Sequence, residues 1–279
     1  MTVTVIGIGL IGGSMALALK ELGLASRVIG VDTDPAHSQK ALELKLVDDI
    51  LPLDKAIGVS QLIILAIPVN SAEKLLPSIL GQVNEQVIMD VGSTKKGLLD
   101  AVADHPKRGR VVATHPMWGT EYSGPEAAVK GAFLNKATVI CDREQTDADA
   151  LATVESLYRS LGMHLVYMNA KDHDVHVAYI SHISHITSFA LANTVLEKEK
   201  EEDAIFELAS GGFESTVRLA KSNPAMWVPI FMQNRENILD VLNEHISQLR
   251  KFKASLEKEN YDYLQELIEQ ANGIKRILK

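Results

Sequence analysis

Short apolar runs alternate with longer amphipathic stretches over the first 168 residues of the chain. The runs are rich in β-branched residues and predict strands at residues 2–6, 27–31, 62–66, 86–90, 111–114, 137–141 and 164–168. Strands that alternate with helical stretches in this way build a mostly parallel sheet, with crossover helices on both of its faces. The pattern therefore predicts a doubly wound α/β domain over residues 1–168.

After residue 169 the pattern becomes helical, and strand signals are few. It predicts helices at about 171–196, 204–209, 214–221, 224–255 and 258–276, with the charged run Glu197–Asp203 as a solvated turn and Gly211-Gly212 as a helix stop. Several helical stretches are apolar on more than one side, which favours burial against a second copy of the chain. Such positions include Ala190, Leu191, Ile230, Leu239 and Leu242. We therefore expect residues 169–279 to form an all-α domain that makes a homodimer.

The first strand leads directly into a glycine-rich turn, Gly7-Ile8-Gly9-Leu10-Ile11-Gly12, and then into a helical stretch. In a Rossmann-type unit the first glycine permits the turn, the second lets a pyrophosphate approach, and the third lets the helix pack on the strand. Asp32 ends the second strand, 32 − 12 = 20 residues after Gly12. A carboxylate there accepts hydrogen bonds from ribose hydroxyls and repels a 2′-phosphate, so we predict NAD in preference to NADP. The predicted cofactor-binding residues are Gly7, Gly9, Leu10, Ile11, Gly12, Asp32, Ile67 and Pro68.

Composition narrows the class of protein further. The chain has 279 residues, of which 46% are hydrophobic, enough for two domains with cores of their own. A net charge of −8 gives no support for nucleic-acid binding. The longest apolar run, Leu62–Val69, falls short of the roughly 20 residues that span a bilayer. Cys141 stands alone in an apolar strand, which favours a core position and a reducing compartment. We therefore expect a cytoplasmic protein with no membrane and no nucleic-acid partner.

Two polar residues follow predicted strands at the edge of the sheet where ligands of such folds bind. His115 follows the fifth strand, and Pro116 restricts the backbone beside it. A neutral imidazole there could accept a proton near pH 7; for an isolated histidine we would favour a structural loop cap, but this position favours the base. Ser93 follows the fourth strand and could bond a substrate hydroxyl, cap the helix expected near Thr94, or do both.

Asp174, His182 and His185 lie on the long helix predicted in the second half. His182 and His185 are three residues apart and share a face of that helix. A zinc site is disfavoured, because the usual helical histidine pair is spaced by four residues around a glutamate and no third ligand stands out. We therefore predict no metal, and favour polar substrate contacts or buried, hydrogen-bonded histidines.

Arg218 lies one or two turns into a helix that starts after the Gly211-Gly212 break. Its planar guanidinium suits a carboxylate ligand, although a surface salt bridge would explain an isolated arginine as well. Trp227 lies nine residues further on and is either a pocket wall or a core residue.

Taken in order, these motifs resemble the prephenate and arogenate dehydrogenases of tyrosine biosynthesis over nearly the whole chain. The matching residues are Gly7/Gly9/Gly12, Asp90/Gly92/Ser93/Lys95, His115/Pro116/Gly119/Glu121/Ser123/Gly124, Ser181/His182/His185, Gly212/Phe213/Arg218 and Trp227. Trp118, Tyr122 and Ser215 depart from residues that are common in that family.

The resemblance implies a role for each candidate. His115 would take the proton from the ring C4 hydroxyl of prephenate as hydride leaves C4 for NAD, and Ser93 would bond the same hydroxyl. Arg218 would hold a substrate carboxylate and His185 would help to shape that pocket; Glu121, Trp227 and His182 are the other expected substrate contacts. Loss of the ring carboxylate as CO₂ would then give 4-hydroxyphenylpyruvate.

Other functions remain open on sequence alone. Arogenate, which would give tyrosine directly, differs from prephenate by an amino group in place of a keto group, and no residue decides between them. A hydroxyacid or imine oxidoreductase with the same layout would leave Ser93 and the His115 segment unexplained. A nonenzymatic NAD-sensing or dimerisation protein would need neither His115 nor Arg218.

Overall fold

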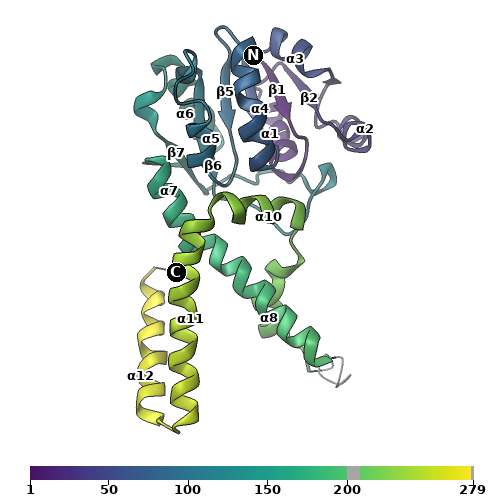
Figure 1. Cartoon of the computed structure of the whole chain (residues 1–279). Coiled ribbons are helices and arrows are strands. Elements are labelled where there is room, and N and C mark those ends of the chain that lie inside the picture. The colour runs from purple at the N-terminus through teal and green to yellow at the C-terminus, as the bar shows by residue number, and fades with distance from the viewer. Residues whose placement is uncertain (200–207, 278–279) are drawn as a thin grey trace. The chain divides into compact units, whose positions relative to one another are not determined.

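The computed structural model describes residues 1–199 and 208–277 (Figure 1). Two compact units are defined by their internal contacts, Met1–Asn234 and Arg235–Lys279. Residues 200–207, which carry most of the predicted helix at 204–209 and part of the predicted turn at Glu197–Asp203, lie outside the described residues. The candidate site residues all belong to the first unit.

One sheet organises the first unit, and within the described residues it has eight strands in the order β3-β2-β1-β4-β5-β6-β7-β8. Neighbouring strands are parallel except β6 and β7, which are antiparallel. The predicted α/β, doubly wound class is therefore confirmed. The strands are β1 (Thr2–Ile6), β2 (Arg27–Val31), β3 (Asp49–Ile50), β4 (Leu62–Leu65), β5 (Val87–Asp90), β6 (Val111–Pro116), β7 (Ala137–Cys141) and β8 (His164–Met168).

Helices cover both faces of this sheet (Figure 1). One core packs α1 (Leu10–Glu21), α2 (Pro35–Glu43) and α6 (Ala148–Ser160) on one face; the other core packs α3 (Leu53–Val59), α4 (Val69–Gln82) and α5 (Lys96–Asp100) on the opposite face. Side chains alternate between the two cores: in β4, Ile64 belongs to the first, and Ile63 and Leu65 belong to the second. Burial on both faces explains why the central strands read as continuous apolar runs.

The helix predicted at 171–196 is a continuous helical segment over residues 170–199. It consists of α7 (Ala170–Val177), a π-helical turn (Ala178–His182) and α8 (Ile183–Glu199). After the undescribed residues come α9 (Gly211–Val217), a 3₁₀ turn (Arg218–Lys221) and α10 (Pro224–Gln233). The helix predicted at 214–221 therefore begins earlier than expected, at Gly211. Asn223 caps α10, because its side chain accepts a hydrogen bond from the backbone N–H of Ala225.

The second unit consists of α11 (Arg235–Glu257), α12 (Tyr261–Ala271) and a 3₁₀ turn (Asn272–Arg276), with the two helices side by side (Figure 1). The single helix predicted at 224–255 is wrong, because Asn234 leaves helical geometry at φ −103° and ψ 24° and separates α10 from α11. Ile230, expected at a dimer contact, is instead buried in the first unit with Val69 and Trp227. Leu239 on α11 is 40% exposed.

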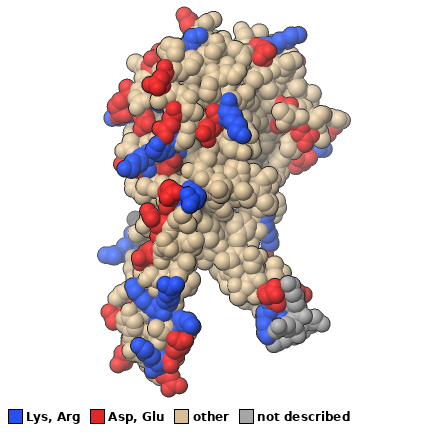
Figure 2. All heavy atoms as spheres, viewed as in Figure 1, with Lys and Arg blue, Asp and Glu red and all other residues tan. Residues whose placement is uncertain are grey.

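Cys141 is a free, fully buried thiol in β7, as predicted for a core residue. In the parts of the chain at 1–199 and 208–277, no helix combines the length and apolarity needed to cross a membrane. Acidic and basic side chains are interspersed on the face seen in Figure 2.

Candidate active site

The glycine turn has the geometry that its sequence predicts. Gly7 has φ +89°, and a Cβ added to it would lie 2.5 Å from the carbonyl oxygen of Ala66. A Cβ added to Gly12 would lie 2.0 Å from the carbonyl oxygen of Gly7, so the start of α1 packs directly on the turn. Around Gly9, no heavy atom of the described residues comes within 4 Å of an added Cβ. Backbone N–H groups at the start of α1 and an open approach at Gly9 together suit a pyrophosphate.

A cavity of about 470 Å³ lies at the carboxyl ends of β1 and β2. Gly7, Gly9, Asp32, Ile67 and Pro68 are among its lining residues, all predicted to bind the cofactor. The Asp32 carboxylate is held in place, because it accepts hydrogen bonds from the backbone N–H groups of Ile8 at 3.0 Å and Asp34 at 2.9 Å. This arrangement suits an adenosine ribose at Asp32.

A smaller cavity of about 210 Å³ shares Gly9, Ile67 and Pro68 with the first and adds Leu10, Ile11 and Ser93 to its lining. A further cavity of about 440 Å³ shares Leu10, Ile11 and Ser93 with the second. Its lining also contains four predicted site residues, His115, His185, Arg218 and Trp227. The shared lining residues place the three cavities next to one another, in one path from Asp32 to Arg218.

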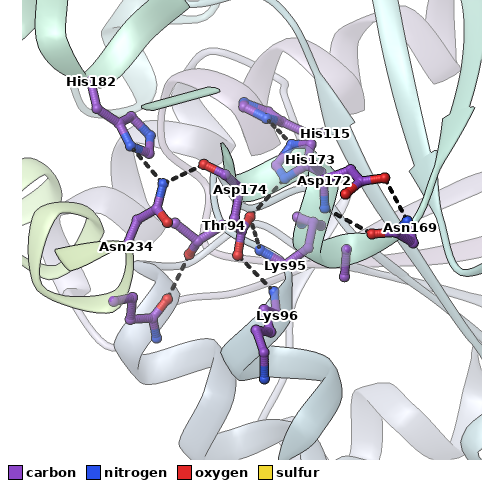
Figure 3. Close-up of polar contacts among 12 residues, drawn as sticks. Thr94, Lys95, Lys96, His115, Asn169, Asp172, His173, Asp174, His182 and Asn234 are labelled. Atoms are coloured by element: carbon purple, nitrogen blue, oxygen red, sulfur yellow. Dashed lines mark hydrogen bonds and ion pairs between the residues drawn. The ribbon is translucent and has the colours of Figure 1, made fainter. Parts of the chain in front are cut away.

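His115 lies at the end of β6, where it forms an antiparallel pair with Val139 of β7. The prediction placed it in a loop after the strand; the structure extends the strand through Pro116 and therefore holds His115 in the sheet. Its Nδ1 atom lies 2.9 Å from Nε2 of His173 on α7, and the two rings meet edge to face with centroids 5.1 Å apart (Figure 3).

His173 in turn bonds to a buried carboxylate, since its Nδ1 lies 2.7 Å from Oδ1 of Asp174 (Figure 3). A carboxylate only accepts hydrogen bonds, so His173 Nδ1 carries the proton and His173 Nε2 accepts one from Nδ1–H of His115. This tautomer leaves Nε2 of His115 without a proton, in the state required of a base.

The directions in which the pKa values of His115 and His173 are shifted agree with a neutral base. Burial holds the pKa of His115 well below its ordinary value, and the neighbouring His173 and Lys95 lower that pKa further. Burial also lowers the pKa of His173, although Asp174 acts in the opposite direction. Both imidazoles are therefore neutral near pH 7, and His115 can accept a proton there.

Ser93 lies in the turn between β5 and α5 and lines both the second and the third cavity. It does not cap α5, which begins at Lys96, so the capping alternative is wrong. The cap is Asp174, whose two carboxylate oxygens accept the backbone N–H groups of Lys95 and Lys96 at 2.9 Å each. From the sequence, Asp174 was considered only as a metal ligand or a substrate contact.

The buried Lys95 side chain bonds to residues near the ends of two neighbouring strands, β5 and β6. Its ammonium group pairs with the Asp90 carboxylate at the end of β5 and donates a hydrogen bond to the carbonyl oxygen of Thr114 at 2.7 Å. Thr114 directly precedes His115 in β6. The motif Asp90-x-Gly92-Ser93-x-Lys95 therefore fixes the Ser93 turn against the strand that carries His115.

Arg218 is half exposed at the third cavity and pairs with Glu121, with Nη1 and Oε2 2.8 Å apart. Arg218 therefore makes a salt bridge and also lines a cavity, and its role as a ligand for a substrate carboxylate stays a prediction. The pKa of the Glu121 carboxyl is lowered by its own backbone N–H and by Arg218. Through this ion pair, Glu121 contacts Arg218, a residue that lines the third cavity.

The ring of His185 stacks on Trp227 at 3.4 Å between centroids, and both residues line the third cavity. His182 is different: it is 1% exposed, it lies edge-on to Trp227, and its Nδ1 lies 3.1 Å from Nδ2 of Asn234. Burial lowers the pKa of His182 to about 4. The structure therefore gives His182 a position behind the cavity wall, and its predicted substrate contact remains a prediction.

Two residues of the site were missed by the sequence analysis, His173 and Lys136. The signal for His173 was its position beside Asp174, one helical step from a carboxylate that was already under consideration. Lys136 immediately precedes β7 and lines the third cavity as a second basic side chain beside Arg218. An isolated lysine after a turn carries no sequence signal of its own.

The fold and the site together define a dinucleotide-dependent dehydrogenase. The sheet is of the Rossmann type, an acidic residue follows β2, and a histidine lies at a strand end beside the nucleotide path. Two family models match the chain: "Prephenate dehydrogenase, nucleotide-binding domain" over residues 15–167 and "Prephenate dehydrogenase, dimerization domain" over residues 169–270. The chain belongs to the prephenate dehydrogenase family.

Individual relatives agree with this assignment. A prephenate dehydrogenase of Bacillus subtilis is 34% identical over 270 residues, which cover 94% of this chain and 72% of the relative. The structure of prephenate dehydrogenase from Aquifex aeolicus, in complex with hydroxyphenyl propionate and NAD⁺, is 27% identical with a TM-score of 0.88, covering 99% of this chain and 97% of that one. An arogenate dehydrogenase structure from Synechocystis is also 27% identical, with a TM-score of 0.77 and full coverage of both chains. The predicted family, the predicted fold class and the prediction of an NAD-dependent dehydrogenase are thus confirmed.

Proposed function

We propose that the chain catalyses the NAD-dependent oxidative decarboxylation of prephenate to 4-hydroxyphenylpyruvate, a step of tyrosine biosynthesis. The observation that carries this proposal is the cavity that His115 and Arg218 line together, next to the path that starts at the glycine turn. The Bacillus subtilis and Aquifex aeolicus relatives named above support prephenate as the substrate.

His115 is the general base of this reaction. Its Nε2 atom takes the proton of the C4 hydroxyl, and Ser93 holds the same oxygen through its side-chain hydroxyl. NAD, when bound, supplies the acceptor for the hydride that leaves C4. The C1 carboxylate then leaves as CO₂, its bonding electrons complete the aromatic ring, and the return reaction is strongly disfavoured.

Substrate capture depends on local cations, because the net charge of −8 repels a dicarboxylate. Arg218 is paired with Glu121, so the two side chains together contribute no net charge. Lys136 adds a further positive charge to the lining of the same cavity. We assign one substrate carboxylate to Arg218 and the other to Lys136, while His185 and Trp227 form an apolar wall against the ring.

Replacement of Arg218 by alanine should raise KM for prephenate roughly tenfold while kcat changes little. The loss of a charge-assisted hydrogen bond sets this size, at the lower end of about 1.5 to 3 kcal/mol because Arg218 is half exposed to solvent. Steady-state kinetics at saturating NAD measure it, with Arg235→Ala as a surface control. An unchanged KM would assign the carboxylate to another residue.

Replacement of Asp32 by serine should shift the kcat/KM ratio of NADP to NAD by about tenfold toward NADP. The carboxylate lies in the first cavity, where it would face the ribose and oppose a 2′-phosphate. Kinetics with both cofactors at fixed prephenate measure the ratio. The same ratio in parent and variant would remove Asp32 from cofactor selection.

We also propose the division into an NAD-binding domain at 1–168 and a helical substrate and dimerisation domain at 169–279. The boundary between the two matched family models supports it, although compact contacts extend the first unit to Asn234. A homodimer formed through the helical domain agrees with exposed apolar side chains at Leu196, Leu249 and Leu256. The enzyme would act in the cytoplasm.

An NADH-formation assay tests the proposed function directly, with prephenate and arogenate as substrates and NAD and NADP as cofactors. We expect the largest kcat/KM with prephenate and NAD. Higher activity with arogenate would favour the alternative that the Synechocystis relative represents, in which tyrosine is the product. No NADH formation with either substrate would overturn the proposed reaction.

A further inference from the structure

Asp174 is a buried carboxylate that contacts both halves of the proposed catalytic machinery. It is 4% exposed, bonds to His173 behind the base His115, and accepts the two backbone N–H groups that open α5 after the Ser93 turn (Figure 3). Asp174 is absent from the lining of the three cavities described above, so it acts on the substrate through other residues. A buried carboxylate is costly to maintain unless its hydrogen bonds are satisfied, and here three donors satisfy it.

We propose that Asp174, His173 and His115 form a proton relay in which the substrate proton comes to rest on His173, beside the Asp174 carboxylate. This inference rests on the proposed function, because it concerns the proton that prephenate releases. His115 remains the catalytic base, and His173 and Asp174 are positioning residues that set its tautomer and stabilise the transferred charge.

The relay balances in protons and charge. The O–H bond of the C4 hydroxyl breaks and its proton binds Nε2 of His115, while the Nδ1–H proton of His115 passes to Nε2 of His173 over 2.9 Å. His115 returns to a neutral imidazole and His173 becomes an imidazolium. Its Nδ1–H group still donates to Asp174 at 2.7 Å, so the new positive charge meets the negative one directly.

The charged groups around the pair favour His173 as the final position. Lys95 faces both imidazoles, but its charge is largely offset by the Asp90 carboxylate with which it pairs. His182, the other titratable neighbour, is neutral because burial lowers its pKa to about 4. Asp174 is then the charge without an ionic partner in this group, and it contacts His173 rather than His115. Burial lowers the pKa of both imidazoles, but Asp174 and Asp90 oppose this lowering at His173, whereas the neighbours of His115 lower its pKa further.

The Asp174 carboxylate also links His115 to Ser93, the two side chains that we assign to the same substrate hydroxyl. Asp174 caps α5 within three residues of Ser93, and the helix start cannot shift without breaking two hydrogen bonds to that carboxylate. Asp174 therefore acts together with Lys95 in fixing the separation of Ser93 from His115.

The experiment compares Asp174→Asn with Asp172→Asn in the full-length enzyme. Asp172 is a nearby carboxylate on α7, it is exposed, and its side chain accepts a hydrogen bond from Asn169 (Figure 3). We expect Asp174→Asn to lower kcat by about 10- to 10²-fold and to move the acid limb of the kcat profile to lower pH by about one unit, because an imidazolium loses its nearby negative charge. Asp172→Asn should keep the parent values. A lower kcat with an unmoved acid limb would mean that Asp174 has only a structural role and would overturn the relay.

A second measurement needs no substrate and remains valid if Asp174→Asn folds poorly. In the parent enzyme with ¹⁵N-labelled histidine at pH 8, NMR should find His115 protonated at Nδ1 only and His173 protonated at Nδ1 only, with assignments from His115→Asn and His173→Gln. Protonation of His115 at Nε2 would contradict the relay. Failure of the relay in a parent that oxidises prephenate would leave the proposed function intact, whereas a parent inactive on prephenate would remove the function whatever the tautomers are.

Discussion

Replacement of His115 by asparagine should lower kcat for prephenate oxidation by about 10² to 10⁴, the usual contribution of a general base. His115 lies at the end of a sheet strand, its Nδ1 is bonded to His173, and the tautomer leaves Nε2 free for the substrate hydroxyl. An asparagine amide can occupy the same space but does not accept a proton at neutral pH. Steady-state NADH formation with saturating prephenate and NAD measures the loss.

Two controls accompany this variant. NAD affinity should be nearly unchanged, because His115 lines the third cavity and is absent from the lining of the first two. His164→Asn, on an exposed residue of β8, should retain the parent kcat. Equal turnover of parent and His115→Asn would exclude His115 as the base. A loss of NAD affinity equal to the loss of kcat would indicate damage to the fold instead.

Gly12→Ala and Gly9→Ala should affect different properties of the protein, although both glycines belong to one turn. At Gly12 the added Cβ would lie 2.0 Å from the Gly7 carbonyl oxygen and 2.9 Å from Val5, so the turn or α1 must move. We expect the free energy of unfolding to fall by about 3 kcal/mol, the upper part of the usual range for overpacking. At Gly9 the apo protein has room for the methyl group, and its stability should stay within about 0.5 kcal/mol of the parent.

The Gly9 variant should instead bind NAD about 10- to 10²-fold more weakly, because the methyl group occupies the approach of the pyrophosphate. Urea unfolding without cofactor and fluorescence titration with NAD separate the two effects, and Gly81→Ala, at a helical glycine outside the site with room for a methyl group, provides a control for titration. Parent-like NAD affinity of Gly9→Ala would place the pyrophosphate elsewhere. Parent-like stability of Gly12→Ala would contradict the packing described for the turn.

The nucleotide half of the site was predictable because its requirements are local in sequence. A strand, a turn with Gly7 and Gly12, and Asp32 at the end of the next strand follow one another within one βαβ unit. Glycine meets the backbone requirement at residues 7 and 12, and a carboxylate meets the charge requirement at residue 32. The carboxyl-end rule for such sheets then indicated where His115 and Ser93 should be sought.

The rest depends on contacts that no local pattern specifies. The antiparallel direction of β7 is not specified by its apolar strand pattern, because that pattern is the same for either direction. The break at Asn234 lies inside a stretch that remains helical on both sides. His173 reaches His115 across 58 residues of sequence, and the link between Asp174 and α5 spans 78 or 79 residues. Spacing on one helix therefore identified Asp174 as a candidate and left its role open.

The central claim is that His115 and Arg218 act on opposite ends of one ring, over the nicotinamide. A crystal structure of the ternary complex with NAD and the product 4-hydroxyphenylpyruvate tests it most directly. We predict that the ring hydroxyl lies about 2.6 to 3.2 Å from Nε2 of His115, with Ser93 on the same oxygen and the Arg218 guanidinium at the far end of the molecule. A product ring bound away from His115, or one whose hydroxyl points toward Arg218, would contradict the account.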